Sequence, residues 1–282
     1  PLWQVALFLI FTHMKALKKI LIGLVALVAV AYLGICVALW FYQEKLIFHP
    51  HPLAADYVFN YPGKHEDVNI TSYDGTKLHG LLFKADTSKG LVFYLHGNAG
   101  ALDTWGDIAP IYNKLGYDIF ILDYRGFGKS QGKLHSEEQV YKDIQAAYDV
   151  LQQRYSEDST VIIGYSIGSG LAAELATTNH PKQLILQAPY YSLTDLGEQM
   201  YPAITPHFLN RYKFETFKFV QQTKAPVAIF HGTKDYVIYY GSALKLKEHF
   251  KAGDTLFTLP EAGHGHLNEN EDYQRELANI LK

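Results

Sequence analysis

A serine flanked by glycines is the strongest chemical signal in the sequence. Gly164, Ser166 and Gly168 form a G-x-S-x-G pattern that directly follows an apolar run at Val161–Ile163 and opens a helical stretch. Between a strand and a helix, this pattern lifts the serine hydroxyl above the sheet, and the two glycines let the strand and the helix approach closely. Ser169 is a weaker candidate because it lacks a glycine two residues before it. The spacing predicts Ser166 as a nucleophile.

A serine hydroxyl needs a general base to become nucleophilic. Two histidines, His264 and His266, stand in the segment directly after the apolar run Leu256–Leu259. We predict His264 as the base, because a Gly-His pair directly after the last strand is the usual placement, and His266 remains the alternative. The H-x-H pair could instead bind a metal, but no carboxylate–histidine cluster with helical spacing accompanies it. We therefore predict no metal and no organic cofactor.

The base in turn needs an acid that fixes its tautomer and stabilises the imidazolium. Asp235 follows the apolar run Val227–Phe230, and the chain order Ser166, Asp235, His264 is the one expected where a G-x-S-x-G serine works with an acid and a histidine. Asp195 and Glu261 are rival acids. Asp195 fits better as part of a helix cap in Ser-Leu-Thr-Asp, so Asp235 is the predicted acid.

The segment His96–Gly100 ends a further apolar run and is rich in glycine. A phosphate-binding loop would need a Lys-Ser or Lys-Thr pair after the glycines, and none follows. We predict instead that the main-chain amides of Asn98 and Ile167 donate to a developing oxyanion. The ring of His96 is expected to orient the loop.

Short apolar runs alternate with amphipathic stretches after residue 67. The predicted strands are Asp67–Ser72, Lys77–Lys84, Leu91–Leu95, Ile119–Asp123, Val161–Tyr165, Leu184–Gln187, Val227–Phe230 and Leu256–Leu259. The predicted helices lie near Asp103–Leu115, Ser136–Arg154, Ile167–Asn179, Gly241–Phe250 and Glu269–Leu281. Apolar strands separated by helices predict an α/β fold with a mostly parallel sheet flanked by helices. The first two strands form a hairpin around Asp74-Gly75. Ligands bind at the carboxyl ends of such strands, where the candidate residues fall.

The N-terminal part differs sharply from the rest in composition. Ile20–Tyr42 contains no charged residue, follows three lysines and ends in aromatic residues. About 20 apolar residues are enough to cross a bilayer, so we predict a transmembrane anchor. A signal peptide cleaved after Ala31 and a lipoprotein signal ending at Cys36 are the alternatives. The run exceeds the usual signal core, and Ile35 is bulkier than the residue expected before a lipidated cysteine.

The organisation that follows has four parts. Residues 1–13 are a possible upstream extension before Met14, residues 14–43 the anchor, residues 44–66 a tether, and residues 67–282 the α/β domain with a short lid at 192–225. The lysines before the anchor predict a cytoplasmic N-terminus and an extracytoplasmic domain, periplasmic in a bacterium.

Composition limits the partners. The net charge is −3, and no long basic run occurs beyond the N-terminus, so we predict no nucleic acid partner. With a single cysteine, the chain cannot form an internal disulfide.

Several motifs together are similar to those of one enzyme superfamily. They are His96–Gly100, Asp123–Ser130, Gly164–Gly168, His231–Asp235 and Gly263-His264. In this order they resemble an α/β-hydrolase, and Glu44–Pro50 adds a resemblance to membrane-anchored, small-lid serine hydrolases that are similar to depalmitoylating thioesterases and bacterial esterase-like proteins. The resemblance covers the chain from about Leu46 to its end.

The resemblance implies a serine hydrolase that forms an acyl-enzyme and cleaves a carboxylic ester or thioester. A peptidase or amidase, or an inactive membrane-bound binding protein, is the alternative. The short lid predicts an open cleft with an apolar wall for an acyl ester from a small molecule or lipid. The residues predicted to form that wall are Tyr190, Tyr191, Tyr201 and Phe208.

Overall fold

The structure, a computed structural model, describes residues 2–201 and 210–282. The chain divides after Gln43 into two compact units, and each is described by itself. The predicted wall residue Phe208 lies outside the described residues.

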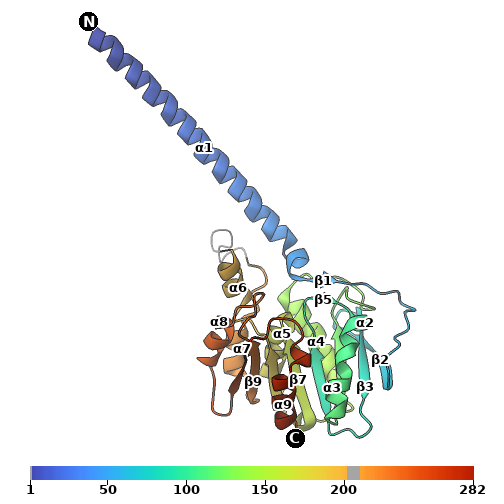
Figure 1. The fold of residues 1–282 in the computed structure, drawn as a ribbon. Coiled ribbons are helices and arrows are strands. Elements are labelled where there is room, and N and C mark those ends of the chain that lie inside the picture. The colour runs from blue at the N-terminus through green and yellow to red at the C-terminus, as the bar shows by residue number, and fades with distance from the viewer. Residues whose placement is uncertain (1, 202–209) are drawn as a thin grey trace. The chain divides into compact units, whose positions relative to one another are not determined.

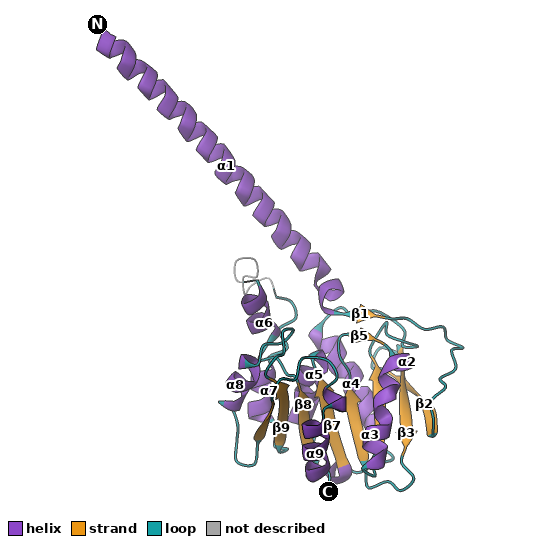
Figure 2. Ribbon diagram, viewed as in Figure 1, coloured by secondary structure: helices purple, strands orange, loops and turns teal. Residues whose placement is uncertain are grey.

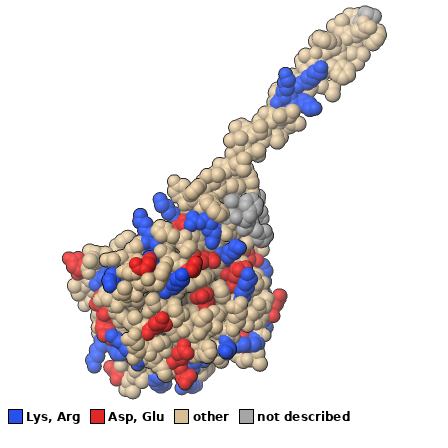
Figure 3. Space-filling model, turned by 180° about the vertical axis from the view of Figure 1, so that it is seen from behind, with Lys and Arg blue, Asp and Glu red and all other residues tan. Residues whose placement is uncertain are grey.

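The first unit is helical. Helix α1 (Leu2–Ile47) runs through it without interruption and covers both the predicted upstream extension and the predicted anchor. Among the described residues it is the one helix long and apolar enough to cross a membrane. The uncharged stretch Ile20–Tyr42 would extend roughly 35 Å at 1.5 Å per residue, which matches a bilayer core. Figure 3 shows one group of basic side chains on this helix, on the N-terminal side of the uncharged stretch.

The second unit is built on a sheet whose described strands number eight. They are β2 (Lys64–Thr71), β3 (Lys77–Lys84), β4 (Leu91–Leu95), β6 (Asp118–Asp123), β7 (Thr160–Tyr165), β8 (Gln183–Gln187), β9 (Val227–Gly232) and β10 (Thr255–Leu259). Across the sheet the order is β10-β9-β8-β7-β4-β6-β3-β2. Strand β3 is antiparallel to both β2 and β6, and the other neighbours are parallel. The predicted fold class is confirmed.

Helices cover both faces of this sheet (Figures 1 and 2). One face packs against α4 (Glu137–Gln152), α5 (Ile167–Thr178), α7 (Thr216–Gln222) and α8 (Gly241–Lys247). The other packs against α2 (Leu102–Trp105), α3 (Ala109–Lys114) and α9 (Glu271–Ile280). The 3₁₀ segments η1 (Gly106–Ile108), η2 (Glu157–Ser159) and η4 (Leu267–Glu269) connect elements. Strand β4 serves both layers, because Phe93 faces one core and Tyr94 the other, and both side chains are fully buried.

Helix α4 illustrates how sequence sets these elements. Ser136 caps it by accepting a hydrogen bond from the amide of Gln139 at 3.2 Å. Apolar residues at helical spacing, from Val140 through Ile144 to Leu151, are buried against the sheet. The periodic pattern therefore predicted this helix to within two residues at each end.

The hairpin β2–β3 turns at Gly75, whose φ of +86° is a conformation that glycine adopts without strain. Arg125 braces this turn, since its guanidinium donates to Asp74 at 2.8 Å and also contacts Asp143 on α4. This ion-pair network joins the loop after β6 to the hairpin and to helix α4.

In the second unit the helix cap predicted at Ser192–Asp195 is present, whereas a second helix in the lid region and a strand in the tether were not predicted. The lid region contains helices α6 (Leu193–Met200) and α7, and Ser192 caps the first by accepting from the amide of Asp195 at 3.0 Å. The tether contributes a short strand β1 (His49–Pro50), which pairs in parallel with β5 (Ala99–Gly100) beside the large sheet (Figure 1).

Candidate active site

Ser166 stands alone in a sharp turn between β7 and α5. A Cβ on Gly164 would lie 2.2 Å from the carbonyl oxygen of Gly168, and one on Gly168 would lie 2.1 Å from the carbonyl oxygen of Leu95. Both positions therefore exclude any larger residue. The glycines allow the first turn of α5 to pack directly against the ends of β7 and β4.

The backbone of Ser166 adopts φ 54° and ψ −120°, a conformation that is costly for a residue with a side chain. Such strain costs on the order of 1–3 kcal/mol and persists only where surrounding contacts enforce it. Here the amide of Ser166 donates to Gln187 of β8 at 2.9 Å, and the hydroxyl of Ser169 donates to the Ser166 carbonyl at 2.6 Å. The turn is thus held from two sides, with the Ser166 side chain left for other partners.

The structure brings the three predicted residues together. The Nε2 atom of His264 lies 3.0 Å from the Oγ atom of Ser166, and its Nδ1 atom lies 2.7 Å from Oδ2 of Asp235. A carboxylate can only accept, so Nδ1 carries the proton and Nε2 is left to accept from the serine hydroxyl. The three side chains come from loops after β7, β9 and β10, which end at the same edge of the sheet.

Asp235 is held as a carboxylate. Burial would raise its pKa, but hydrogen bonds from His231 and His264 and from the amide of Ile238 outweigh burial and place the pKa well below its usual range. Its other oxygen, Oδ1, accepts from the amides of Val237 and Ile238 at 2.9 and 2.8 Å. The side chain is fully shielded from solvent. The group facing the imidazole therefore stays negative at neutral pH and can stabilise an imidazolium.

The alternatives considered from sequence are occupied elsewhere. His266 is largely exposed and pairs with Glu269 at 3.1 Å. Asp195 contacts Lys245 and accepts from the hydroxyl of Tyr239 at 2.6 Å. The exposed carboxylate of the rival acid Glu261 pairs with a lysine of the loop after β9.

Known proteins share this architecture. Residues 86–216 match the family described as serine aminopeptidase, S33. Over 245 residues the chain is 29% identical to an uncharacterized protein of Mycobacterium tuberculosis, with 85% of this chain and 86% of that protein covered. It is also 29% identical over 206 residues to the α/β hydrolase domain-containing protein 17C of Mus musculus, covering 70% of this chain and 61% of that protein. The solved esterase Pf2001 of Pyrococcus furiosus superposes with a TM-score of 0.66 at 20% identity, covering 83% of this chain and 97% of the esterase. The chain has the α/β-hydrolase fold.

This fold places the two predicted oxyanion donors just after neighbouring strands. Strands β4 and β7 pair in parallel with Leu95 opposite Gly164, so Asn98 and Ile167 follow the same ends of adjacent strands. Within the described residues, neither backbone amide donates to a protein acceptor. The helix macrodipole of α5 adds positive potential at Ile167. Both amides therefore remain available to a ligand, and their role as oxyanion donors stays a prediction.

Two residues that position the hydrolase's histidine and acid escaped the sequence analysis. The hydroxyl of Tyr165 donates to the carbonyl of His264 at 2.7 Å and fixes the loop after β10. The fully buried ring of His231 lies 3.4 Å from Oδ2 of Asp235 and 2.9 Å from the Ile238 carbonyl. Their positions next to the elbow serine and at the end of β9 were the only sequence signals.

The predicted apolar wall is partly wrong. Tyr190 is fully buried, and its hydroxyl donates to the Ile167 carbonyl at 3.2 Å, so it supports α5 from behind and offers no surface to a substrate. Tyr191 is half-buried, with its ring stacked on Phe217 at 4.6 Å. Tyr201 is exposed, at 55% of its full surface.

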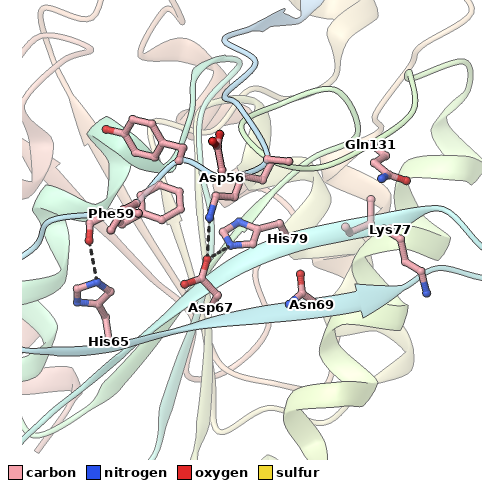
Figure 4. Close-up of a pocket in the computed structure, with 13 residues that line it drawn as sticks. Asp56, Phe59, His65, Asp67, Asn69, Lys77, His79 and Gln131 are labelled. Carbon is pink, nitrogen blue, oxygen red and sulfur yellow. Dashed lines mark hydrogen bonds and ion pairs between the residues drawn. The ribbon is translucent and has the colours of Figure 1, made fainter.

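A cavity of about 650 Å³ lies at a different place in the hydrolase (Figure 4). Strands β2 and β3 and the tether line it, and strands β4 and β6 separate β3 from the nucleophile strand β7. In this cavity His79 and Lys129 both contact Asp67, at 2.7 and 3.1 Å. Burial would raise the pKa of Asp67, but these two partners lower it. Ser166, Asp235 and His264 do not line this cavity.

Proposed function

We propose that the protein is a serine hydrolase that cleaves carboxylic esters or thioesters through an acyl-enzyme on Ser166. One observation carries the proposal: Ser166, His264 and Asp235 form a continuous chain of hydrogen bonds, with atoms 3.0 and 2.7 Å apart, and Ser166 lies at a strained turn. Hydrogen-bonded nucleophile, base and orienting acid are the components of acyl transfer.

In the proposed mechanism, His264 takes the proton of Ser166 as the hydroxyl attacks the acyl carbonyl. The negative charge that forms on the carbonyl oxygen is stabilised by the amides of Asn98 and Ile167. The imidazolium, stabilised by Asp235, returns the proton to the leaving alcohol or thiol. Water then attacks the acyl-enzyme with the same histidine as base, and the acid product leaves.

An amidase or peptidase is the second candidate, and the family description of serine aminopeptidase favours it. The names of the structural relatives favour an ester, since the superposing protein of Pyrococcus furiosus is an esterase. A second structural relative is Est1E of Butyrivibrio proteoclasticus, whose structure was solved with ferulic acid bound. It superposes on this chain with a TM-score of 0.63. Amide cleavage also demands that the leaving nitrogen be protonated and held by contacts specific to the substrate. We place esters and thioesters first.

We further propose that helix α1 anchors the enzyme in a membrane, with the catalytic unit on the extracytoplasmic side. The length and composition of the helix and the lysines on its N-terminal side support this arrangement. The substrate would then be an acyl ester of a small molecule or lipid, with no nucleic acid, metal or organic cofactor involved.

A fluorophosphonate probe tests the reaction class. The full chain in mild detergent should be labelled at Ser166, and it should hydrolyse nitrophenyl esters and an acyl thioester faster than peptide amides. Ser166→Ala should abolish labelling. It should also reduce turnover to the small residual rate that substrate binding and the oxyanion donors can support without a nucleophile. Ser88→Ala, at an exposed serine between β3 and β4, is the control and should be labelled normally.

Three results would contradict parts of this proposal. Labelling of the Ser166→Ala protein would refute the nucleophile. Peptide hydrolysis ten times faster than that of every ester would establish the amidase. A wild-type chain that neither reacts with the probe nor turns over any substrate would establish an inactive binding protein.

A further inference from the structure

The segment Glu44–Pro52, which we call the docking segment, belongs to the catalytic unit. It runs beside the loop that carries Asn98, where β1 and β5 pair in parallel with His49 opposite Ala99 and Pro50 opposite Gly100 (Figure 1). The sequence predicts this segment only as part of the tether at residues 44–66.

Three hydrogen bonds join the docking segment to the loop. The side-chain amide of Asn98 donates to the Ile47 carbonyl at 2.9 Å, and the amide of His49 donates to the Asn98 carbonyl at 2.8 Å. The amide of His51 donates to the Gly100 carbonyl at 3.3 Å. Both the side chain and the carbonyl of Asn98 are therefore held by this segment, while its own amide remains without a protein acceptor in the described part of the chain.

The docking segment is itself held firmly from the lid side. The ring of Phe48 is 4% exposed and packs edge-on against Tyr212 and Phe214, with ring centroids 6.0 and 6.3 Å away. Glu44 pairs with Arg211 at 2.9 Å and accepts from the Tyr212 hydroxyl at 3.2 Å. Aromatic packing of this kind contributes beyond simple area burial.

Its other end is fixed by the loop after β6. The amide of Gly128 donates to the His51 carbonyl at 3.0 Å, and the amide of Leu53 donates to the Gly128 carbonyl at 2.8 Å. The segment therefore offers the loop a row of partners whose own positions are set by two separate parts of the fold, the lid side and the loop after β6.

We propose that the docking segment positions the oxyanion donor, with the Asn98 side chain as the positioning residue. The inference rests on the proposed function, because it concerns the direction of the Asn98 main-chain amide during acyl transfer. A donor stabilises an oxyanion only when it is aimed at the site where charge develops. Clamping the carbonyl and side chain of Asn98 restricts its rotation, and its amide is thereby aimed before substrate arrives.

The test uses the full chain in detergent and compares two identical substitutions. Asn98→Asp keeps the size of the side chain but replaces the donor to the Ile47 carbonyl by a carboxylate that repels it. Asn113→Asp is the matched control, because the Asn113 side-chain amide also donates to a carbonyl, that of Tyr117, at 2.9 Å and is also half-buried. A milder variant, Asn98→Ala, removes the bond without introducing repulsion and serves if the first variant does not fold.

The readout separates positioning from folding. Active sites are titrated with the fluorophosphonate, and kcat and KM for a nitrophenyl ester are measured per titrated site. Removing a whole oxyanion donor lowers kcat by about 10²–10³-fold, so a misaimed donor should lower it by roughly 10–100-fold. We expect that loss for Asn98→Asp, about tenfold for Asn98→Ala, and less than about twofold for Asn113→Asp, with KM changed little in each.

The outcomes also separate this inference from the proposed function. A wild-type enzyme with normal turnover and Asn98 variants with unchanged kcat per site would overturn the positioning role and leave the serine mechanism standing. A fall in the number of titratable sites at unchanged kcat would assign Asn98 a purely structural role, which also overturns it. Turnover that survives Ser166→Ala would instead refute the proposed function.

Discussion

Glu174 is an acidic residue whose ionised form is disfavoured by burial, and it lies on α5, the helix that begins just after the candidate nucleophile. Its side chain is half-buried on α5, and within the described residues it has no hydrogen-bond or ion-pair partner. Burial raises its pKa from 4.5 to about 7. The nearby Tyr141 hydroxyl is buried without a partner as well. We predict that Glu174→Gln stabilises the protein at alkaline pH.

The sign and size follow from proton linkage. Below pH 4.5 the carboxyl is protonated in the folded and the unfolded chain, so the substitution changes little. Between pH 4.5 and 7 the unfolded chain releases its proton first, and the free energy of unfolding of the wild type falls as pH rises. At 1.36 kcal/mol per pKa unit the complete effect is roughly 3 kcal/mol, and partial contact with solvent brings the expectation to about 1–3 kcal/mol above pH 7.

Thermal unfolding of the full chain in detergent at pH 5, 6, 7 and 8 measures this effect. For a chain of this size, 1–3 kcal/mol corresponds to an increase in Tm of about 2–10 °C at pH 8, and the gain should shrink towards pH 5. Glu138→Gln is the control, because Glu138 is exposed on α4 and pairs with Lys142 at 2.6 Å. A gain from Glu174→Gln that is equal at every pH, or absent at pH 8, would refute the reasoning.

Three further predictions concern the site and the anchor. Asp235→Asn should lower kcat for a nitrophenyl ester by about 10⁴-fold, because His264 would be held in the wrong tautomer. A loss below tenfold would contradict the triad. His266→Ala should leave kcat within about twofold, since His266 pairs with Glu269 and not with Ser166; a severe loss would make His266 the base. Removing residues 1–42 should release an active, soluble protein in a fractionation assay, whereas removing residues 1–52 should reduce kcat because the docking segment is lost; equal activity of the two would contradict its role.

Much of the site could be predicted because its signals are local. The nucleophile turn requires glycines at Gly164 and Gly168 for reasons of contact within a few residues, and these appear directly in the sequence. Strand β9 before Asp235 is buried along its whole length, and the edge strand β10 before His264 is partly exposed. The apolar runs Val227–Phe230 and Leu256–Leu259 nevertheless located both strands to within two residues. Chain order then suggested which acid and which base belong together.

Other properties depended on contacts between distant parts of the chain. Tyr190 and Tyr191 are adjacent, and the sequence does not distinguish their environments. In the structure Tyr190 is buried behind α5, whereas Tyr191 is stacked on Phe217. Similarly, nothing local distinguishes the docking segment from a loose tether, because its partners lie about 50 residues away at Asn98. Such differences arise from the packing of the whole unit.

The sequence by itself determined the fold class, the apolar N-terminal stretch and the identity of the residues that the structure brings together, since each is written in a local pattern of residue types. Tertiary structure alone decided that Ser166 and Asp235 each lie within hydrogen-bond distance of His264, that Glu174 has no partner among the described residues, and that Asn98 is held by the docking segment. The physical reason is that distances and burial depend on how separate elements pack, which no single stretch of sequence specifies.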